Sequence, residues 1–462
     1  MSDNPRKAYV VAVDMGYGHQ RAVYPLRRFA ASPASWNWPE EKIISANDYP
    51  GMPIFDRIRW SFTEKAYESI SRLHGLPLFG PIIFELLAYV EKIADFYPRR
   101  NLSQPILPLR LLYALIRGGF GKALIDKLNE RPLPLIVSFP LVAFMAEEHG
   151  YKEEIYCLCT DTDIARSWAP LRPHRSRITY LAPTVRVRER LRLYGVQHDK
   201  VIVTGFPLPE TAGYDNDFDR SQADKATIGA RLSRLDPQIR YRHKYGELIR
   251  LYLGNHLRLD ENAVTNRDQG PSFTLMFAIG GAGAQAAIAL SILESLRYEI
   301  AANNVRLFLV AGTSKTIRDR FTAAAARFNL DRSLGSSLRI IYNDDKYAYF
   351  QEFNSLLPET DILWTKPSEL SFYAGLGLPV IMSPALGPQE ECNRSWLHMM
   401  GAGFEEYDPR YTQEWLFDWI DSGWLAEAAM NGYINAPKQA ASHIEDIVLR
   451  GERHEIEDIH FV

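Results

Sequence analysis

Cysteine is scarce in this chain. Only Cys157, Cys159 and Cys392 occur among 462 residues, which is too few for a disulfide framework and favours a reducing compartment. Cys157 and Cys159 form a Cys-x-Cys pair without a second pair or a nearby histidine cluster, and such a pair makes a poor zinc site. We therefore expect neither a disulfide scaffold nor a structural metal.

Long apolar runs are missing as well. The longest, PLFGPIIFELLAYV at 77–90, is shorter than the roughly 18 residues that cross a bilayer and contains Gly, Pro and Glu. The first residues, MSDNPRKAYVVAVDMGYGH, lack the apolar core of a signal peptide. These absences predict a cytoplasmic protein, with any membrane association peripheral and on the inner face.

What the chain does have is ordinary globular composition. Hydrophobic residues make up 46% and charged residues 24%, over a length that suits two or three domains. Residues 1–210 carry 28 Lys and Arg against 22 Asp and Glu, whereas the remainder carries 25 against 34. A basic first half is typical of a domain that meets an anionic partner, although an accidental spread of solvated charge gives the same totals.

Apolar, β-branched segments alternate with helical patterns along most of the chain. This alternation predicts an α/β protein with βαβ units and parallel sheets, whose ligands bind at the carboxyl ends of the strands. The candidate strands are residues 8–14, 133–139, 154–160, 177–183, 200–206, 273–280, 305–312, 338–344, 361–366 and 378–384.

A polar interval divides these strands into two groups. We expect a Rossmann-like N-terminal domain at 1–210, a linker or helical insertion at 211–271, and a second Rossmann-like domain at 272–440. Residues 441–462 are expected to form a tail or a helix.

The region 50–125 carries alternating apolar and basic clusters, which are typical of amphipathic helices that cover a core. A second interpretation is a surface that enters a membrane interface. The residues expected to insert are Trp60, Phe62, Leu112 and Tyr113, beside Arg57, Arg59, Arg110 and Arg117.

The turn after the first candidate strand reads Asp14-Met-Gly-Tyr-Gly-His-Gln and opens a helix. Gly16 and Gly18 allow close approach of an acceptor to the backbone, and the helix start presents N–H groups. His19 could take a proton from an attacking hydroxyl, because an imidazole titrates near neutral pH. The alternative for His19 is a structural role at the helix start.

A second loop, Gly280-Gly-Ala-Gly-Ala-Gln285, lies between a strand and a helix. Its small residues before a helix start could hold a diphosphate without a lysine. The donor-binding candidates here are Gly280, Gly281, Gly283, Ala284 and Gln285. Gly281 to Ala286 also matches the dinucleotide pattern G-x-G-x-x-A, but the next strand ends at Gly312-Thr313 without the acidic residue that holds a ribose. The loop therefore favours a nucleotide diphosphate over NAD.

Polar residues also follow the last two candidate strands. Lys366, Ser368 and Glu369 come after one strand, and a carboxylate such as Glu369 can accept both hydroxyls of a ribose. Gln389 and Asn393 are four residues apart, so on a helix they share a face that could hold a sugar. Taken singly, such residues are more often helix caps and surface polar groups.

These motifs together resemble one enzyme family. D-x-G-x-G-H at 14–19, Thr160-Asp161, VTGFP at 203–207, GG-x-G at 280–283 and the stretch GLPVIMSPALGPQEECNRSWLHMMGAG at 377–403 resemble the monogalactosyldiacylglycerol synthase/MurG type of glycosyltransferase.

The resemblance implies a GT-B fold, with two Rossmann-like domains facing across a cleft, an acceptor on the first and a UDP-sugar on the second. It also implies that His19 acts as the base and that Gln389, Glu390 and Asn393 contact the donor. Phe372 stands where the family has its ribose-binding glutamate, and Glu369 lies three residues earlier.

The expected reaction is transfer of a hexose from a nucleotide-diphosphate sugar to a hydroxyl of a lipid-type acceptor at an anionic membrane surface. His19 or Asp161 would deprotonate that hydroxyl, the anomeric carbon would invert, and neither a metal nor a cofactor would be needed. The alternatives are a nucleotide-sugar epimerase of the same shape and a nucleotide-sugar-binding protein without turnover. Nucleic acid is not expected as a partner, because the basic residues are scattered rather than gathered in one aromatic-lined stripe.

Overall fold

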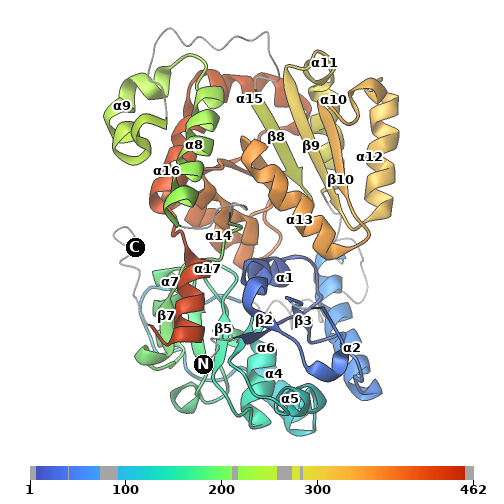
Figure 1. The fold of residues 1–462 in the computed structure, drawn as a ribbon, viewed down its shortest axis with the longest axis vertical. Coiled ribbons are helices and arrows are strands. Elements are labelled where there is room, and N and C mark those ends of the chain that lie inside the picture. Colours follow the sequence, from blue (N-terminus) through green and yellow to red (C-terminus); the bar gives the residue numbers. More distant parts are fainter. Residues whose placement is uncertain are drawn as a thin grey trace. The chain divides into compact units, whose positions relative to one another are not determined.

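The computed structural model describes residues 7–39, 41–72, 92–210, 217–256, 273–280 and 285–452. The chain forms two compact units (Figure 1). The first unit comprises Met1–Leu208, Leu386–Asn393 and Pro437–Val462, and the second comprises Pro209–Ala385 and Arg394–Ala436.

The first unit is built on a sheet of parallel strands in the order β2-β1-β4-β5-β6-β7, with β3 also paired to β1. These strands are β1 (Ala8–Ala12), β2 (Ala30–Ala31), β3 (Ile44–Ser45), β4 (Leu135–Val137), β5 (Ile155–Leu158), β6 (Thr179–Ala182) and β7 (Val201–Val203). The helices are α1 (Gly18–Val23), α2 (Ile54–Arg72), α4 (Leu107–Arg117), α5 (Lys122–Leu128), α6 (Pro140–Glu148), α7 (Val185–Leu193) and α17 (Ala440–Glu445).

The second unit repeats this arrangement with the strand order β10-β9-β8-β11-β12-β13, again all parallel. The strands are β8 (Phe273–Ala278), β9 (Val305–Gly312), β10 (Leu338–Tyr342), β11 (Ile362–Thr365), β12 (Val380–Met382) and β13 (Gly403–Glu405). The helices are α8 (Asp217–Leu235), α9 (Arg240–Leu253), α10 (Ala286–Ser295), α11 (Arg297–Ala301), α12 (Lys315–Arg327), α13 (Lys346–Leu356), α15 (Thr412–Asp421) and α16 (Trp424–Asn435). Helix α14 (Pro388–Met400) contributes its first half to the first unit and its second half to the second.

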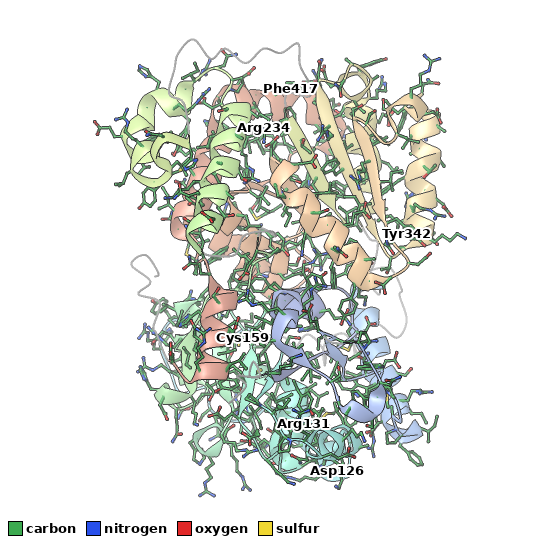
Figure 2. All side chains as sticks on the ribbon, viewed as in Figure 1. Asp126, Arg131, Cys159, Arg234, Tyr342 and Phe417 are labelled. Carbon is green, nitrogen blue, oxygen red and sulfur yellow. The ribbon has the colours of Figure 1, made fainter. Side chains whose placement is uncertain are left out.

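The strands are short and apolar because both faces of each sheet are covered by helices. Every residue of β1, β4, β5, β6 and β8 is buried, as expected for parallel strands in an α/β fold. Cys157 and Cys159 are fully buried within this packing, and Figure 2 labels Cys159 among the side chains of the first unit.

Both sheets reverse their winding after their third strand. The chain moves from β1 to β2 and β3 on one side and then to β4 on the other, and from β8 to β9 and β10 before it crosses to β11. This is Rossmann-like winding in two parallel-sheet units, as predicted. In open α/β sheets, ligands bind at the carboxyl ends of the strands where the winding reverses, which here means the loops after β1 and β4 and after β8 and β11.

The structure contains all ten predicted strands. Three further strands, β2, β3 and β13, were not predicted, and each is only two or three residues long. The interval 211–271 contributes α8 and α9 to the second unit, where both contact α16. After α16 the chain returns to the first unit, where Glu445 pairs with Arg28 at 2.8 Å.

The amphipathic region 50–125 covers the core, and it also leaves apolar side chains exposed. Trp60 and Tyr113, which we expected at a membrane interface, are only 2% exposed and belong to the core. Phe62 is 77% exposed, as that interpretation requires. None of the described helices combines the length and the apolar character needed to cross a bilayer.

Candidate functional site

The loop after β1 is braced by Asn47. The Asp14 N–H donates to Asn47 Oδ1 at 2.7 Å, and Asn47 Nδ2 donates to the Asp14 carbonyl at 3.3 Å. Gly16 follows with a φ of +86°, a backbone conformation that favours glycine. The predicted acceptor-side residues Gly16 and Gly18 therefore lie in a fixed turn, and α1 begins at Gly18.

His19 joins the two loops at which the first sheet reverses. Its Nδ1 lies 2.8 Å from the carbonyl oxygen of Ser138, the residue after β4. A carbonyl oxygen can only accept, so Nδ1 carries the proton, and in the neutral ring the lone pair lies on Nε2. The ring of Phe139 packs edge-on against the imidazole at 4.9 Å. Nε2 is thus the atom that can accept a proton from a ligand.

Asp161, the second predicted base, follows β5 and is part of a hydrogen-bond network within the first unit. Asn393 Nδ2 donates to Asp161 Oδ1 at 2.9 Å, and the Thr160 hydroxyl donates to Asp161 Oδ2 at 3.2 Å. Asn393 Oδ1 accepts from the N–H and the hydroxyl of Thr162, both at 2.9 Å. The predicted donor residue Asn393 is fully buried, and its amide connects α14 to the loop after β5.

A buried ion pair supports that same loop. Arg190 on α7 binds both carboxylate oxygens of Asp163 at 2.8 Å, and Asp163 Oδ1 also accepts from the Ile164 N–H at 2.9 Å. Nearby, burial raises the pKa of Cys392 to about 12, and it also raises the pKa of Cys157 and Cys159. All three thiols therefore stay protonated at neutral pH, which argues against a cysteine nucleophile.

In the second unit, the loops after β8 and β11 approach each other closely. A Cβ placed on Gly280 would lie 2.9 Å from Cε of Lys366, so glycine gives the lysine room at this position. Gln285 stands at the N-terminal end of α10 and is only 7% exposed, and its Oε1 has no hydrogen-bond partner among the described residues. The predicted donor residues Gly281, Gly283 and Ala284 lie outside the described residues.

Ser368 and Glu369 begin a 3₁₀ helix, Glu369–Leu376, directly after β11. Phe372, at the family's glutamate position, is 3% exposed and packs against Trp396 at 5.2 Å. Phe372 therefore belongs to the core. The carboxylate in this helix is that of Glu369, which lies in its first turn.

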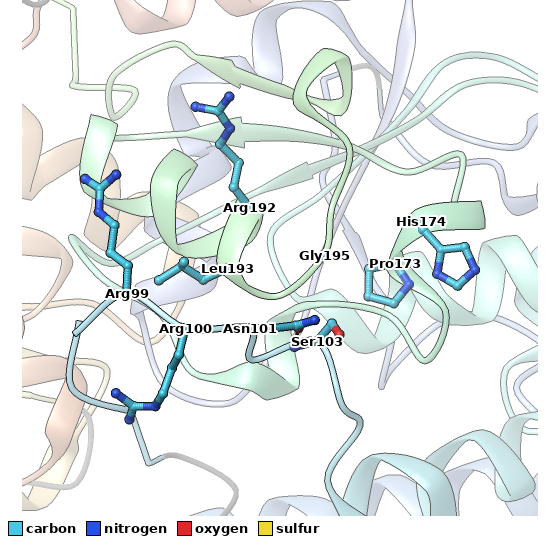
Figure 3. Close-up of a pocket in the computed structure, with 9 residues that line it drawn as sticks. All are labelled: Arg99, Arg100, Asn101, Ser103, Pro173, His174, Arg192, Leu193 and Gly195. Atoms are coloured by element: carbon cyan, nitrogen blue, oxygen red, sulfur yellow. Dashed lines mark hydrogen bonds between the residues drawn. The ribbon is translucent and has the colours of Figure 1, made fainter. Parts of the chain in front are cut away.

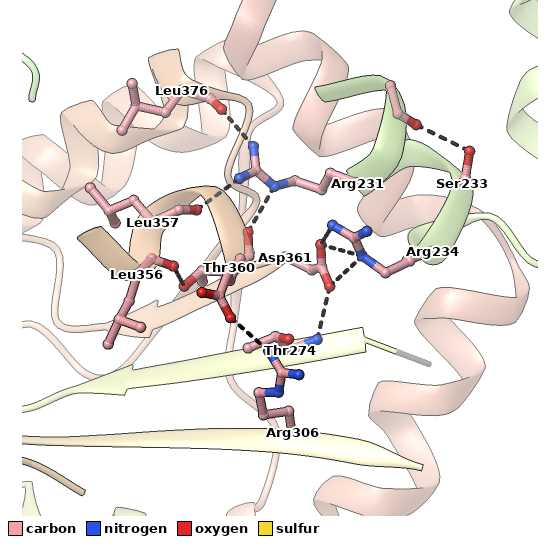
Figure 4. A network of polar contacts seen from close by, with 12 residues as sticks. Arg231, Ser233, Arg234, Thr274, Arg306, Leu356, Leu357, Thr360, Asp361 and Leu376 are labelled. Carbon is pink, nitrogen blue, oxygen red and sulfur yellow. Dashed lines mark hydrogen bonds and ion pairs between the residues drawn. The ribbon is translucent and has the colours of Figure 1, made fainter. Parts of the chain in front are cut away.

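Helix α8 holds the end of this 3₁₀ helix in place (Figure 4). Arg231 on α8 is 1% exposed and donates to the carbonyls of Thr360, Leu357 and Leu376 at 2.9, 3.1 and 2.6 Å. Burial lowers the pKa of Arg231 to about 10. One turn on, Arg234 forms a bidentate pair with Asp361. The interval 211–271 thus supports the loop that carries Glu369.

At the start of α14, Glu390 and Gln389 have different environments. Glu390 Oε2 accepts from the Leu386 N–H at 2.8 Å, which fixes the turn before the helix. Gln389 is half-buried, and its amide makes no hydrogen bond within the described ranges. Of the two predicted donor residues, Gln389 is the better placed to bind a ligand.

Sequence reasoning missed a polar cluster at the carboxyl ends of β11 to β13. Glu406 Oε2 accepts from Trp364 Nε1 and from the Ser383 hydroxyl, both at 2.8 Å. Burial raises the pKa of Glu406. Glu406 follows β13, a strand that the sequence did not predict, so no signal indicated this residue.

No protein-family model and no curated protein matches this chain. Among solved structures, S. aureus MnaA with UDP is similar over 98% of this chain and 100% of that one, at 13% identity and a TM-score of 0.46. UDP-GlcNAc 2-epimerase from Neisseria meningitidis bound to UDP-GlcNAc covers 96% and 100% at 13% identity and a TM-score of 0.45. Acinetobacter baumannii MurG covers 96% and 99% at 10% identity and a TM-score of 0.45. At these identities and scores, nothing about activity or ligand follows from the likeness.

Proposed function

We propose that this protein is a glycosyltransferase. It moves a hexose from a nucleotide-diphosphate sugar, with UDP as the expected nucleotide, to a hydroxyl of a lipid-type acceptor. The observation that carries the proposal is His19, which sits at the start of α1 where the first sheet reverses and whose Nδ1 is bonded to the Ser138 carbonyl. A histidine held in one tautomer at a ligand-binding edge suits a general base.

In the proposed reaction, His19 Nε2 takes the proton of the acceptor hydroxyl. The acceptor oxygen then forms a bond to the anomeric carbon while the bond from that carbon to the diphosphate breaks, so the configuration inverts. Asp161 is the alternative base. Its carboxylate already accepts hydrogen bonds from Asn393 and Thr160, which makes His19 the preferred candidate.

The second unit would bind the donor. The start of α10, with Gly280 and Gln285, is the proposed diphosphate site, because backbone N–H groups and the helix dipole stabilise negative charge. Lys366 beside Gly280 adds a positive charge. Glu369, which follows β11 in the same unit, is proposed to bind the ribose. These groups would stabilise the leaving diphosphate without a metal, and activity that persists in excess EDTA is the expected result.

The acceptor is proposed to be a lipid because the first unit exposes an apolar face on two helices. On α2 the exposed side chains are Ile54, Phe55, Ile58 and Phe62, and on α4 they are Leu107, Leu111 and Leu115. We call these seven residues the apolar face. Arg57 and Arg110 are exposed on the same helices, as suits a surface that contacts anionic headgroups.

Phe372 favours one alternative, a protein that binds nucleotide sugars without turnover, because the family's ribose-binding glutamate is replaced here by a core side chain. An epimerase of the same fold is the other alternative. Incubation with labelled UDP-sugars and mixed lipids separates the three. Label in the lipid fraction supports a transferase, an interconverted UDP-sugar supports an epimerase, and UDP binding without product supports the inactive protein.

A further inference from the structure

The first unit contains a basic cavity of about 450 Å³ that none of the predicted site residues lines (Figure 3). Three segments form it. Its lining residues are Arg99, Arg100, Asn101, Ser103, Pro173, His174, Arg192, Leu193 and Gly195.

The cavity lies at the amino ends of the strands. The segment with His174 precedes β6, and Arg192 is in the last turn of α7, which starts directly after β6 and runs back along the sheet. A hydrogen bond from the Leu102 N–H to the Leu193 carbonyl at 2.9 Å fixes the third segment there. His19 and Asp161 follow the carboxyl ends of strands, so the cavity is at the opposite edge of the sheet.

The charges around the cavity do not balance. The lining holds three arginines and no acidic residue. One carboxylate outside it, Glu189, accepts from Arg192 at 2.8 Å and lies 3.9 Å from Arg99 and 3.7 Å from Arg188. The single carboxylate of Glu189 thus lies close to three guanidinium groups, those of Arg99, Arg188 and Arg192. Arg99 and Arg192 lie on the same side of the cavity (Figure 3).

The third lining arginine, Arg100, is not paired with Glu189. Its side chain extends away from those of Arg99 and Arg192 (Figure 3), and among the described residues it donates only to the Pro98 carbonyl, at 3.3 Å. Asn101 and Ser103 add neutral hydrogen-bonding groups to the same segment. The Arg100 guanidinium beside neutral donors suits a phosphate, whose oxygens accept from planar N–H pairs.

We propose that this cavity is a second anion site, distinct from the donor site, which binds the phosphate group of a small molecule or of a lipid headgroup. The volume is in the range of small-ligand pockets. A lipid source is compatible with the chain path, because Ser103 lies four residues before Leu107 of the apolar face, at most about 14 Å away along an extended chain. The inference does not depend on the proposed glycosyltransferase activity.

The test uses the full chain and inorganic pyrophosphate, titrated calorimetrically at low salt with and without excess UDP, so that binding at the donor site is separated. Arg100→Gln should weaken pyrophosphate binding by at least about tenfold, since a charge-assisted contact to phosphate is lost. The control is Arg131→Gln, which changes an exposed arginine of the same unit that does not line the cavity. Its affinity for pyrophosphate should stay within about twofold of the wild type.

Flotation with phosphatidylglycerol-containing vesicles then identifies the source. If Arg100→Gln also loses vesicle binding and pyrophosphate displaces the wild type, the ligand is a lipid headgroup. If vesicle binding is unchanged while pyrophosphate binding is lost, the ligand is a soluble phosphate. The proposal is overturned if the wild type does not bind pyrophosphate in the presence of UDP, if Arg100→Gln binds it equally well, or if Arg131→Gln loses as much affinity.

Discussion

His19 is the side chain on which the proposed chemistry depends most. Replacing it with alanine removes the proton acceptor and leaves the β1 and β4 loops without their connecting hydrogen bond. We expect transfer from the nucleotide sugar to fall by about 10²–10⁴-fold, the usual contribution of a general base, with little change in donor affinity. Label transfer and UDP titration on the same preparation measure the two quantities.

The matched control for this variant is His198→Ala, which removes an exposed histidine of the first unit. Its activity should equal that of the wild type. A His19→Ala protein that folds normally and retains nearly full turnover would exclude His19 as the base and leave Asp161 as the candidate.

Glu406 provides a pH-dependent prediction. Burial raises its pKa above the usual 4.5, so as the pH rises past 4.5 the unfolded chain releases this proton before the folded protein does. The carboxyl then opposes folding increasingly until the pH passes its folded-state pKa. Glu406→Gln stays neutral, so the free energy of unfolding of the wild type should fall relative to that of the variant over this pH interval.

Urea denaturation at several pH values measures this difference. Glu414→Gln, which changes an exposed glutamate of the same unit, should run parallel to the wild type throughout. Parallel curves for Glu406→Gln and the wild type would mean that the Glu406 pKa is ordinary.

At the scale of elements, the apolar face of α2 and α4 should determine membrane binding. Phe55 is 70% exposed and Phe62 is 77% exposed, and burying one such side chain in lipid contributes about 1.5–3 kcal/mol. The double variant Phe55→Ser, Phe62→Ser should reduce binding to anionic vesicles by about tenfold or more, as measured by flotation.

Leu251→Ser offers a control of equal exposure on the second unit, because Leu251 on α9 is also 77% exposed. It should float like the wild type. If both variants float as well as the wild type, the apolar face does not bind lipid, and a water-soluble acceptor becomes the better proposal.

At the scale of the whole molecule, the chain crosses back to the first unit near its end. Ile444 on α17 is fully buried there, and Gly205 (φ +78°) packs closely on Pro437. Ile444→Ala should lower the stability of the first unit by about 2–5 kcal/mol, as large-to-small core changes do.

Hydrogen exchange resolved by peptide measures this effect. Protection should fall in the β1–β7 sheet and stay unchanged in the β8–β13 sheet. Arg450→Ala, which removes only an exposed ion pair with Asp446, should leave the protection of both sheets unchanged. Loss of protection in the second sheet alone would contradict the assignment of α17 to the first unit.

The sequence by itself determined the two parallel sheets. Alternating apolar segments and helical patterns are local signals, and they placed every long strand as well as the turns with His19 and Gly280. Strands β2, β3 and β13 escaped prediction because their pairing with β1 and β12 is set by neighbouring strands rather than by their own residues.

Only the tertiary structure decided which polar residues meet. Asn393 and Asp161 are far apart in the sequence, so their hydrogen bond could not be read from spacing, and the same holds for Glu406 with Trp364 and for the arginines of the basic cavity. The tertiary structure also shows that Trp60 and Tyr113 are buried, whereas Phe62 is exposed. Periodicity shows that a helix is amphipathic, but burial depends on which neighbours cover its apolar side chains.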